Sequence, residues 1–209
     1  MTNCLILVDL QYDFMPGGAL AVQEGDRVVP IANHIMENFS MIVSTQDWHP
    51  ADHGSFASQH SGKKPGDLID LHGLQQVLWP DHCVMNTEGA KFHKDLRIEK
   101  IQKVFPKGQE KTVDSYSGFF DNGKRKATGM HEYLKENGVK KIFVCGLALD
   151  FCVKFTAVDA KELGYDTYLI EDACRAVNLS PGDDKKAIED MKALGIHCIS
   201  SSDIEKYNV

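Results

Sequence analysis

Four residues with acid–base or nucleophilic side chains each follow an apolar run that is typical of a strand. Cys152 follows the run that breaks at Gly146, at a point where a helix is expected to begin. Free N–H groups and the helix dipole at that position favour a thiolate and could hold an oxyanion. Asp9, Asp47 and Lys107 follow three other runs. Together they supply a base, a cation and a nucleophile for thiol acyl transfer, although most free cysteines are simply small buried hydrophobes.

A second set of ligand-type residues lies in the segment from 47 to 97. Asp47 and His49 are two residues apart in an extended stretch, so their side chains point the same way. Carboxylate and imidazole ligands with open positions suit a divalent ion such as zinc. The D-x-H pair is short and common, so spacing alone leaves a metal site open. Further histidine candidates in this segment are His53, His60, His72 and His82.

Strands and helices are expected to alternate along the chain and to position these residues. The expected strands are 4–9, 41–45, 103–105, 141–145, 166–170 and 196–200. The expected helices are 26–39, 128–137, 152–163 and 183–194. This alternation predicts an α/β fold with a doubly wound, mainly parallel six-stranded sheet and helices on both faces, in one domain over residues 1–209. Ligands of such a sheet bind beyond the carboxyl ends of the strands, so the four reactive residues are expected along one rim.

The stretch from about 47 to 97 is too long for a plain connection in a compact domain. It contains both tryptophans and most of the histidines. We therefore expect a functional loop region there with short helical pieces, for example around Leu68 to Leu78.

Composition restricts the class of protein. The formal net charge of −7 argues against nucleic acid or a membrane surface as a partner. Neither a signal-peptide pattern nor an apolar run of membrane-spanning length is visible. Six cysteines without a C-x-x-C pair indicate free thiols in a reducing compartment. We therefore expect an intracellular, cytoplasmic protein, and a homo-oligomer is left open.

Seven segments, in order over nearly the whole chain, carry a specific resemblance. They are V-D-L-Q-Y-D-F (8–14), P-G-G-A-L (16–20), S-T-Q-D-W-H-P-A-D-H-G-S-F-A (44–57), W-P-D-H-C-V (79–84), V-D-S-Y-S-G-F-F-D-N (113–122), G-L-A-L-D-F-C-V-K-F-T-A (146–157) and D-A-C-R-A-V (172–177). With these motifs the chain resembles the nicotinamidases and pyrazinamidases of the isochorismatase-like cysteine hydrolase family. It departs from the family at Leu149-Asp150-Phe151, where relatives often have Thr and Tyr, but the cysteine and the glycine are retained.

The resemblance implies hydrolysis of nicotinamide to nicotinate and ammonia through a cysteine thioester, a reaction of NAD salvage. It implies a catalytic triad of Asp9, Lys107 and Cys152. It also implies a cis peptide between Leu147 and Ala148, with an oxyanion hole formed by the N–H groups of Ala148 and Cys152.

The resemblance further implies one divalent metal ion, with Zn²⁺ as the favoured identity, that binds the pyridine nitrogen and orients the substrate. Its ligands would be Asp47, His49 and His82, with His53 as a weaker fourth candidate. The side chains that would wall the pyridine ring are Phe14, Trp79 and Tyr116.

Three alternatives are left open. The chain could be another hydrolase of the family, such as an N-carbamoyl amidase or an isochorismatase. It could be a metallohydrolase in which the ion activates water and Cys152 is only structural. It could also be a non-catalytic interaction module, although retention of the cysteine argues against this. The expected metal ligands beside the triad favour a pyridine carboxamide as the substrate.

Overall fold

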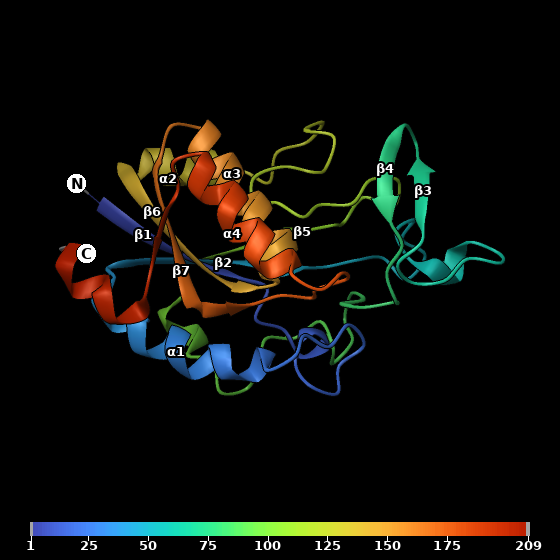
Figure 1. Ribbon diagram of the computed structural model, residues 1–209, viewed down its shortest axis with the longest axis horizontal. Coiled ribbons are helices and arrows are strands. Elements are labelled where there is room, and N and C mark those ends of the chain that lie inside the picture. Colours follow the sequence, from blue (N-terminus) through green and yellow to red (C-terminus); the bar gives the residue numbers. More distant parts are fainter. Residues whose placement is uncertain (1, 208–209) are drawn as a thin grey trace.

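The computed structural model describes residues 2–207 and is built around one six-stranded sheet (Figure 1). All neighbouring strands are parallel, in the order β5-β2-β1-β6-β7-β8. The strands are β1 (Thr2–Val8), β2 (Met41–Asp47), β5 (Lys103–Lys107), β6 (Val139–Leu147), β7 (Asp166–Arg175) and β8 (His197–Ile199). The chain winds outward from β1 to β2 and β5, and then from β6 to β7 and β8. The strand order therefore reverses between β1 and β6, which is where ligands bind in such sheets.

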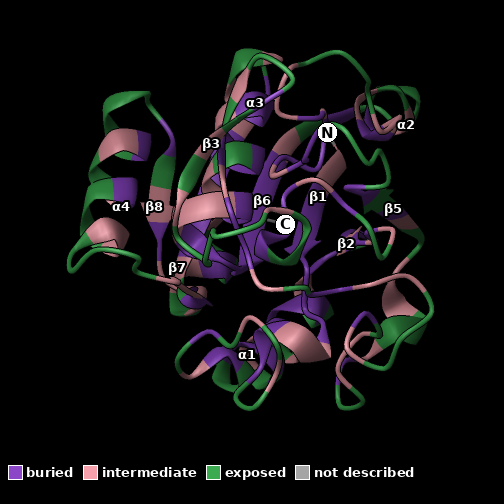
Figure 2. Ribbon diagram, turned by 90° about the vertical axis from the view of Figure 1, so that its right-hand side faces the viewer, coloured by how far each residue is buried: buried purple, intermediate pink, exposed green. Residues whose placement is uncertain are grey.

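Helices cover both faces of this sheet, as Figures 1 and 2 show. Helix α1 lies on one face, and α2, α3 and α4 lie on the other. Their bounds are α1 (Val28–Ile35), α2 (Met130–Glu136), α3 (Lys154–Glu162) and α4 (Asp183–Ala193). The α1 residues Val28, Ala32 and Ile35 are buried at helical spacing, which explains how α1 packs on the sheet. The predicted α/β fold class with six parallel strands is thus confirmed.

The region between β2 and β5 differs from prediction. Residues 68–77 form an antiparallel hairpin of β3 (Leu68–Leu71) and β4 (Leu74–Val77), so the helical pieces predicted there are wrong. The turn residues His72 and Gly73 have φ values of 52° and 86°, as a type I′ hairpin turn requires. The hairpin stands beyond the carboxyl ends of the parallel strands (Figure 1).

Helix α3 begins at Lys154 and not at Cys152 as predicted. A π-helical turn, Leu149–Val153, connects β6 to α3 and contains the cysteine. The N–H groups of Phe151 and Val153 both donate to the Ala148 carbonyl oxygen, at 3.1 Å each. Within residues 2–207, none of the helices combines the length and apolar character that crossing a membrane requires.

Candidate active site

Lys107, the last residue of β5, is the buried centre of the candidate site. Its ammonium nitrogen is 2.9 Å from Asp9 Oδ2 and 3.3 Å from Cys152 Sγ. It also donates to an oxygen of Asp47 and, at 2.9 Å, to the Ser115 carbonyl oxygen. The three residues predicted as a triad therefore meet, with Lys107 in contact with both Asp9 and Cys152. They come from the end of β1, the end of β5 and the π turn.

Asp9 follows β1 directly and is held by the neighbouring strand β2. Thr45 Oγ1 donates to Asp9 Oδ1 at 2.6 Å and accepts the Asp9 N–H at 3.2 Å. The other oxygen, Oδ2, faces the Lys107 ammonium at ion-pair distance and has no further donor within residues 2–207. Oδ2 is therefore the oxygen of Asp9 that can accept a proton.

The two carboxylates beside Lys107 have pKa values displaced in opposite directions. Burial, together with the charge of Asp47, raises the pKa of Asp9 above its ordinary value of 3.8, even though Lys107 lowers it. Burial also raises the pKa of Asp47, but Lys107 and His49 outweigh that effect and hold this pKa well below 3.8. Asp9 is thus the carboxylate suited to accept a proton, whereas Asp47 remains an anion.

The Cys152 thiol does not have the lowered pKa that its predicted position at a helix start implied. Burial raises its pKa well above 9.0, and the charges of Asp9 and Asp47 raise it further, while Lys107 opposes them. The side chain sits inside the π turn rather than at the exposed end of an α-helix. The resting group is therefore a neutral thiol, which needs a base within reach when it attacks.

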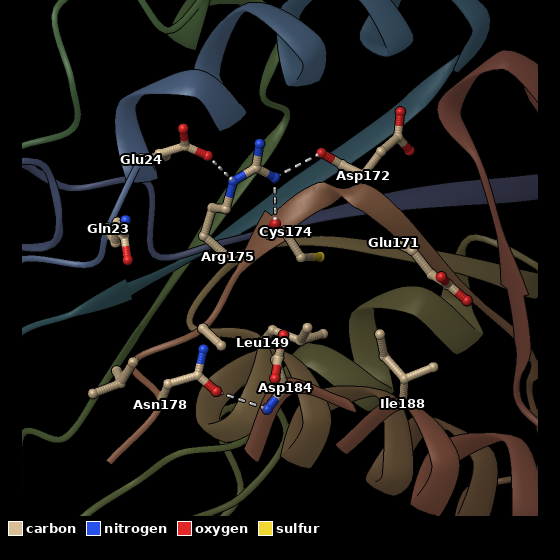
Figure 3. Close-up of a pocket in the computed structure, with 12 residues that line it drawn as sticks. Gln23, Glu24, Leu149, Glu171, Asp172, Cys174, Arg175, Asn178, Asp184 and Ile188 are labelled. Carbon is tan, nitrogen blue, oxygen red and sulfur yellow. Dashed lines mark hydrogen bonds and ion pairs between the residues drawn. The ribbon is translucent and has the colours of Figure 1, made fainter. Parts of the chain in front are cut away.

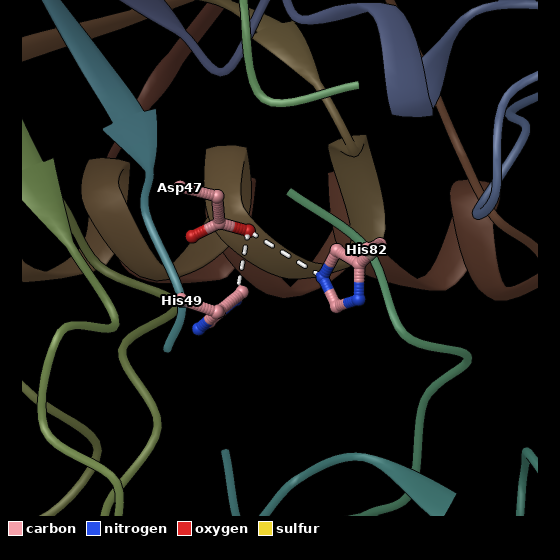
Figure 4. Close-up of side chains that lie close together, drawn as sticks. All are labelled: Asp47, His49 and His82. Atoms are coloured by element: carbon pink, nitrogen blue, oxygen red, sulfur yellow. Dashed lines mark ion pairs between the residues drawn. The ribbon is translucent and has the colours of Figure 1, made fainter. Parts of the chain in front are cut away.

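Asp47, His49 and His82 converge a short distance from this centre (Figure 4). Asp47 Oδ2 is 3.6 Å from His49 Nε2 and 3.7 Å from His82 Nε2, and all three side chains are buried. Ligand atoms that share one zinc ion at ~2.1 Å lie roughly 3–4 Å from each other. The spacing of these three donors therefore fits a single metal ion.

Backbone carbonyls orient both imidazoles for such a role. His49 Nδ1 is 2.8 Å from the Gly108 carbonyl oxygen, and His82 Nδ1 is 2.8 Å from the Pro80 carbonyl oxygen. A carbonyl oxygen only accepts, so Nδ1 carries a proton in both rings, and Nε2, on the side of Asp47, is the atom that would bind a metal ion. One carboxylate and two imidazoles form a donor set that suits Zn²⁺ and similar transition-metal ions.

His53 lies beside these residues but is directed to another acid. Its ring centroid is 4.4 Å from that of His49, and its ligand-type atoms group with those of His49 and Asp114. Ser55 occupies Nδ1 through its hydroxyl at 2.7 Å and its N–H at 3.2 Å. Burial lowers the pKa of His53 to about 4, so this ring is neutral near pH 7. The structure does not bring His53 together with Asp47 and His82.

A small, mostly apolar pocket is lined by Cys152 and also by Asp47 and His82. Aromatic walls with a few polar side chains are typical of pockets that bind small ligands. Ala148 also lines this pocket, and the Leu147–Ala148 peptide is cis, as the family resemblance implied. The predicted wall residues that line it are Phe14, Trp79 and Tyr116.

Two residues that shape the site were missed at the sequence level. Phe151 is a further aromatic wall, because its ring contacts Trp79 at 4.8 Å and Tyr116 at 5.4 Å between centroids. The sequence shows this residue only as part of a departure from the family pattern. Gln11 exchanges hydrogen bonds with the backbone N–H and carbonyl of Asp47, at 2.8 Å each. The sequence signal that could have identified Gln11 was its position in the motif at residues 8–14.

A wider hollow lies beside this site, between the end of β7 and α4 (Figure 3). Arg175 donates to the carbonyl oxygens of Asp172 and Cys174, at 3.1 and 2.7 Å, and pairs with Glu24 at 3.5 Å. This guanidinium is therefore occupied by groups of the protein itself. None of the predicted catalytic or metal-ligating residues lines the hollow, so its larger size does not make it the active site.

Comparison with known proteins gives a consistent assignment. Residues 3–203 match the family described as the isochorismatase domain. The chain is 48% identical over 208 residues to the nicotinamidase of Escherichia coli K12, covering 98% of this chain and 97% of that protein. The solved nicotinamidase–pyrazinamidase of Acinetobacter baumanii superposes with a TM-score of 0.94 at 43% identity, covering 97% of this chain and 98% of that one. The Pyrococcus horikoshii pyrazinamidase, solved in complex with zinc, gives 0.78 at 38% identity, covering 96% and 99%. The chain therefore belongs to the isochorismatase family, among its nicotinamidases.

Proposed function

We propose that this chain hydrolyses the carboxamide of nicotinamide to nicotinate and ammonia through a thioester on Cys152. The observation that carries this proposal is the contact of the Lys107 ammonium with both Asp9 and Cys152 at the floor of a small aromatic pocket. Asp47 and His82, two of the three expected metal ligands, line the same pocket and would hold an ion that binds a ring nitrogen. The nicotinamidase activity of the relatives supports the same substrate.

In the acylation step, Asp9 removes the thiol proton while the sulfur of Cys152 attacks the amide carbon. Lys107 stabilises the negative charge as it passes from sulfur to the carbonyl oxygen. The N–H groups of Ala148 and Cys152 hold that oxyanion. Asp9 then gives its proton to the leaving nitrogen, ammonia departs, and the acyl group remains on sulfur.

In the second step, Asp9 acts as a base again. It takes a proton from a water molecule, which attacks the thioester carbon, and the C–S bond breaks. The sulfur regains its proton and nicotinate leaves. A carboxylate that must accept and return protons benefits from a raised pKa, which is the direction that burial imposes on Asp9.

Orientation of the ring is the remaining requirement. The rings of Phe14, Trp79 and Tyr116 would wall the pyridine. A divalent ion, which we propose to be Zn²⁺ held by Asp47, His49 and His82, would supply orientation when bound by taking the pyridine nitrogen as a ligand.

Asp47 joins the two halves of the site. One of its oxygens accepts from Lys107, and the other faces the two histidines. A single buried side chain therefore fixes the distance between the nucleophile and the ring-binding end.

We further propose that residues 1–209 form one hydrolase domain in which 47–97 is the metal- and substrate-binding region. In this proposal the enzyme acts in the cytoplasm, in NAD salvage.

The test is release of ammonia from nicotinamide by the purified, metal-replete protein, with nicotinate identified as the co-product. We expect one nicotinate per ammonia, and hydrolysis of the related ring pyrazinamide. Activity only on an N-carbamoyl substrate or on isochorismate would replace this function with another of the family. Iodoacetamide addresses the metal-hydroxide alternative: alkylation of Cys152 abolishes a thiol-dependent activity, whereas an enzyme with a structural cysteine would survive it.

A further inference from the structure

One face of the β3–β4 hairpin has three apolar side chains and one buried polar side chain, that of Gln76. Ile69 pairs with Gln76, and Leu71 pairs with Leu74, so these four side chains share one face of the hairpin. Gln76 is only 2% exposed, whereas its neighbour Gln75 is exposed. A buried amide in so small an element needs partners, and these lie in the active site.

The Gln76 amide nitrogen lies within hydrogen-bond distance of two acceptors that line the pocket and of one in its own strand. It is 2.9 Å from the Tyr116 hydroxyl, 3.1 Å from Asp114 Oδ2 and 2.8 Å from the Val77 carbonyl oxygen. A carboxylate and a carbonyl only accept, so the NH₂ end of the amide faces this cluster. The Tyr116 oxygen also accepts from Trp79 Nε1 at 3.2 Å.

Two walls of the pocket are therefore held through one oxygen atom. Trp79 and Tyr116 stand nearly perpendicular, at 85° with centroids 6.4 Å apart. Both rings also contact Phe151, so the three rings pack against one another. The Gln76 amide donates to the Tyr116 hydroxyl oxygen, which also accepts from Trp79, and so connects the hairpin to both rings.

We infer that Gln76 is a positioning residue that sets the spacing of the Trp79 and Tyr116 rings for a flat heteroaromatic carboxamide. It does so from the hairpin, without lining the pocket itself. This inference rests on the proposed function. It gives the hairpin a role in ring binding that is separate from the proton transfers at Cys152.

The first test replaces Gln76 with Leu, which is of similar size and lacks the donors. We expect KM for nicotinamide to rise about 10-fold, equivalent to about 1.4 kcal/mol, with a much smaller change in kcat. The rate of Cys152 alkylation by iodoacetamide should stay at the wild-type value, because the triad is untouched. The matched control is Gln75→Leu on the exposed face of the same strand, which should leave KM unchanged.

The second test uses Tyr116→Phe, which keeps the ring and removes the oxygen on which the two donors converge. This variant also covers the case in which Gln76→Leu does not fold. We expect a similar rise in KM, and no further rise in the double variant, because both changes break the same contact. A wild-type KM in folded Gln76→Leu or Tyr116→Phe, or effects that add in the double variant, would overturn the inference. Absence of nicotinamide hydrolysis in the wild-type protein would instead refute the proposed function.

Discussion

The neutral state of the Cys152 thiol makes the proposed nucleophile dependent on its neighbours. We expect Cys152→Ala and Cys152→Ser to lose essentially all ammonia release while remaining folded, because the small side chains fit the buried turn. Within residues 2–207, no other cysteine sulfur lies at hydrogen-bond distance from Lys107. Activity assays with circular dichroism check this expectation. Cys198→Ser, at a half-buried thiol in β8, is the control that should keep full activity. A folded and fully active Cys152→Ala protein would rule out the covalent mechanism.

Asp9 carries the proton in every step, so its substitution should act on kcat. Asp9→Asn should lower kcat by at least about 100-fold, the usual effect of losing a positioned proton-transfer group. Since the base must be ionised and burial raises the pKa of Asp9, wild-type kcat/KM should fall as pH falls through a value above 3.8. Asp52→Asn, at an exposed acid paired with Lys111, is the control. Near-normal turnover of Asp9→Asn would remove Asp9 from the role of base.

Lys107 lowers the pKa of both Asp9 and Cys152, so its removal should raise both. We expect Lys107→Ala to lower kcat at least about 100-fold, and to move the acidic limb of the pH profile to higher pH. Alkylation of Cys152 near neutral pH should also slow, because less thiolate is present. Lys111→Ala, which removes an exposed lysine, should change neither. An unchanged limb in Lys107→Ala would contradict the electrostatic role given to this residue.

For single residues, the sequence predicted which side chains meet in the site but not their charge states. Asp9 and Lys107 could be placed at the rim because each ends an apolar run in a parallel sheet. The pKa of Cys152 could not be predicted, since it depends on complete burial and on two carboxylates that come from other strands. The contacts of Gln76 were also invisible, because a glutamine in a loop region gives no sign of burial.

Among the elements, the parallel strands were the most predictable and the hairpin the least. Strands β1 and β6 lie at the centre of the sheet and are covered on both faces, so they read as continuous apolar runs. The run of leucines from 68 to 78 suggested a helix because its spacing is ambiguous over so short a stretch. The His72-Gly73 pair was the signal for a two-residue hairpin turn, since glycine adopts a positive φ without cost.

The segment from β2 to His82 would be joined at both ends by the proposed metal ion. We expect a chelator to increase hydrogen exchange in residues 47–82, with little change in α4, because Asp47 and His82 are no longer held together.

His49→Ala should raise KM for nicotinamide and lower kcat, since the amide is no longer aimed at sulfur. Single-turnover kinetics on stripped protein distinguish the roles of the ion. A normal acylation burst with stalled turnover would contradict the orienting role, and absence of bound metal by elemental analysis would remove the site.

At the scale of the whole molecule, the doubly wound topology explains why distant parts of the chain make one site. β1 and β6 are adjacent in the sheet although about 140 residues separate them, and the strand order reverses there. Asp9 and the turn that carries Cys152 therefore emerge side by side, and β5 brings Lys107 from the edge. This arrangement was predictable from the alternation of elements, whereas the distances between the three side chains required the structure.

The most direct measurement is rapid quenching of the metal-replete protein with nicotinamide, followed by mass spectrometry of the intact chain and of its peptides. We predict that ammonia appears before nicotinate, and that a nicotinoyl group is found on the peptide containing Cys152 and on no other. Asp9→Asn should form this adduct much more slowly, and Cys152→Ser should give no thioester. The mechanism would be contradicted if nicotinamide turned over at a normal rate without a detectable adduct. It would also be contradicted if the protein still released nicotinate and ammonia together after full alkylation of Cys152.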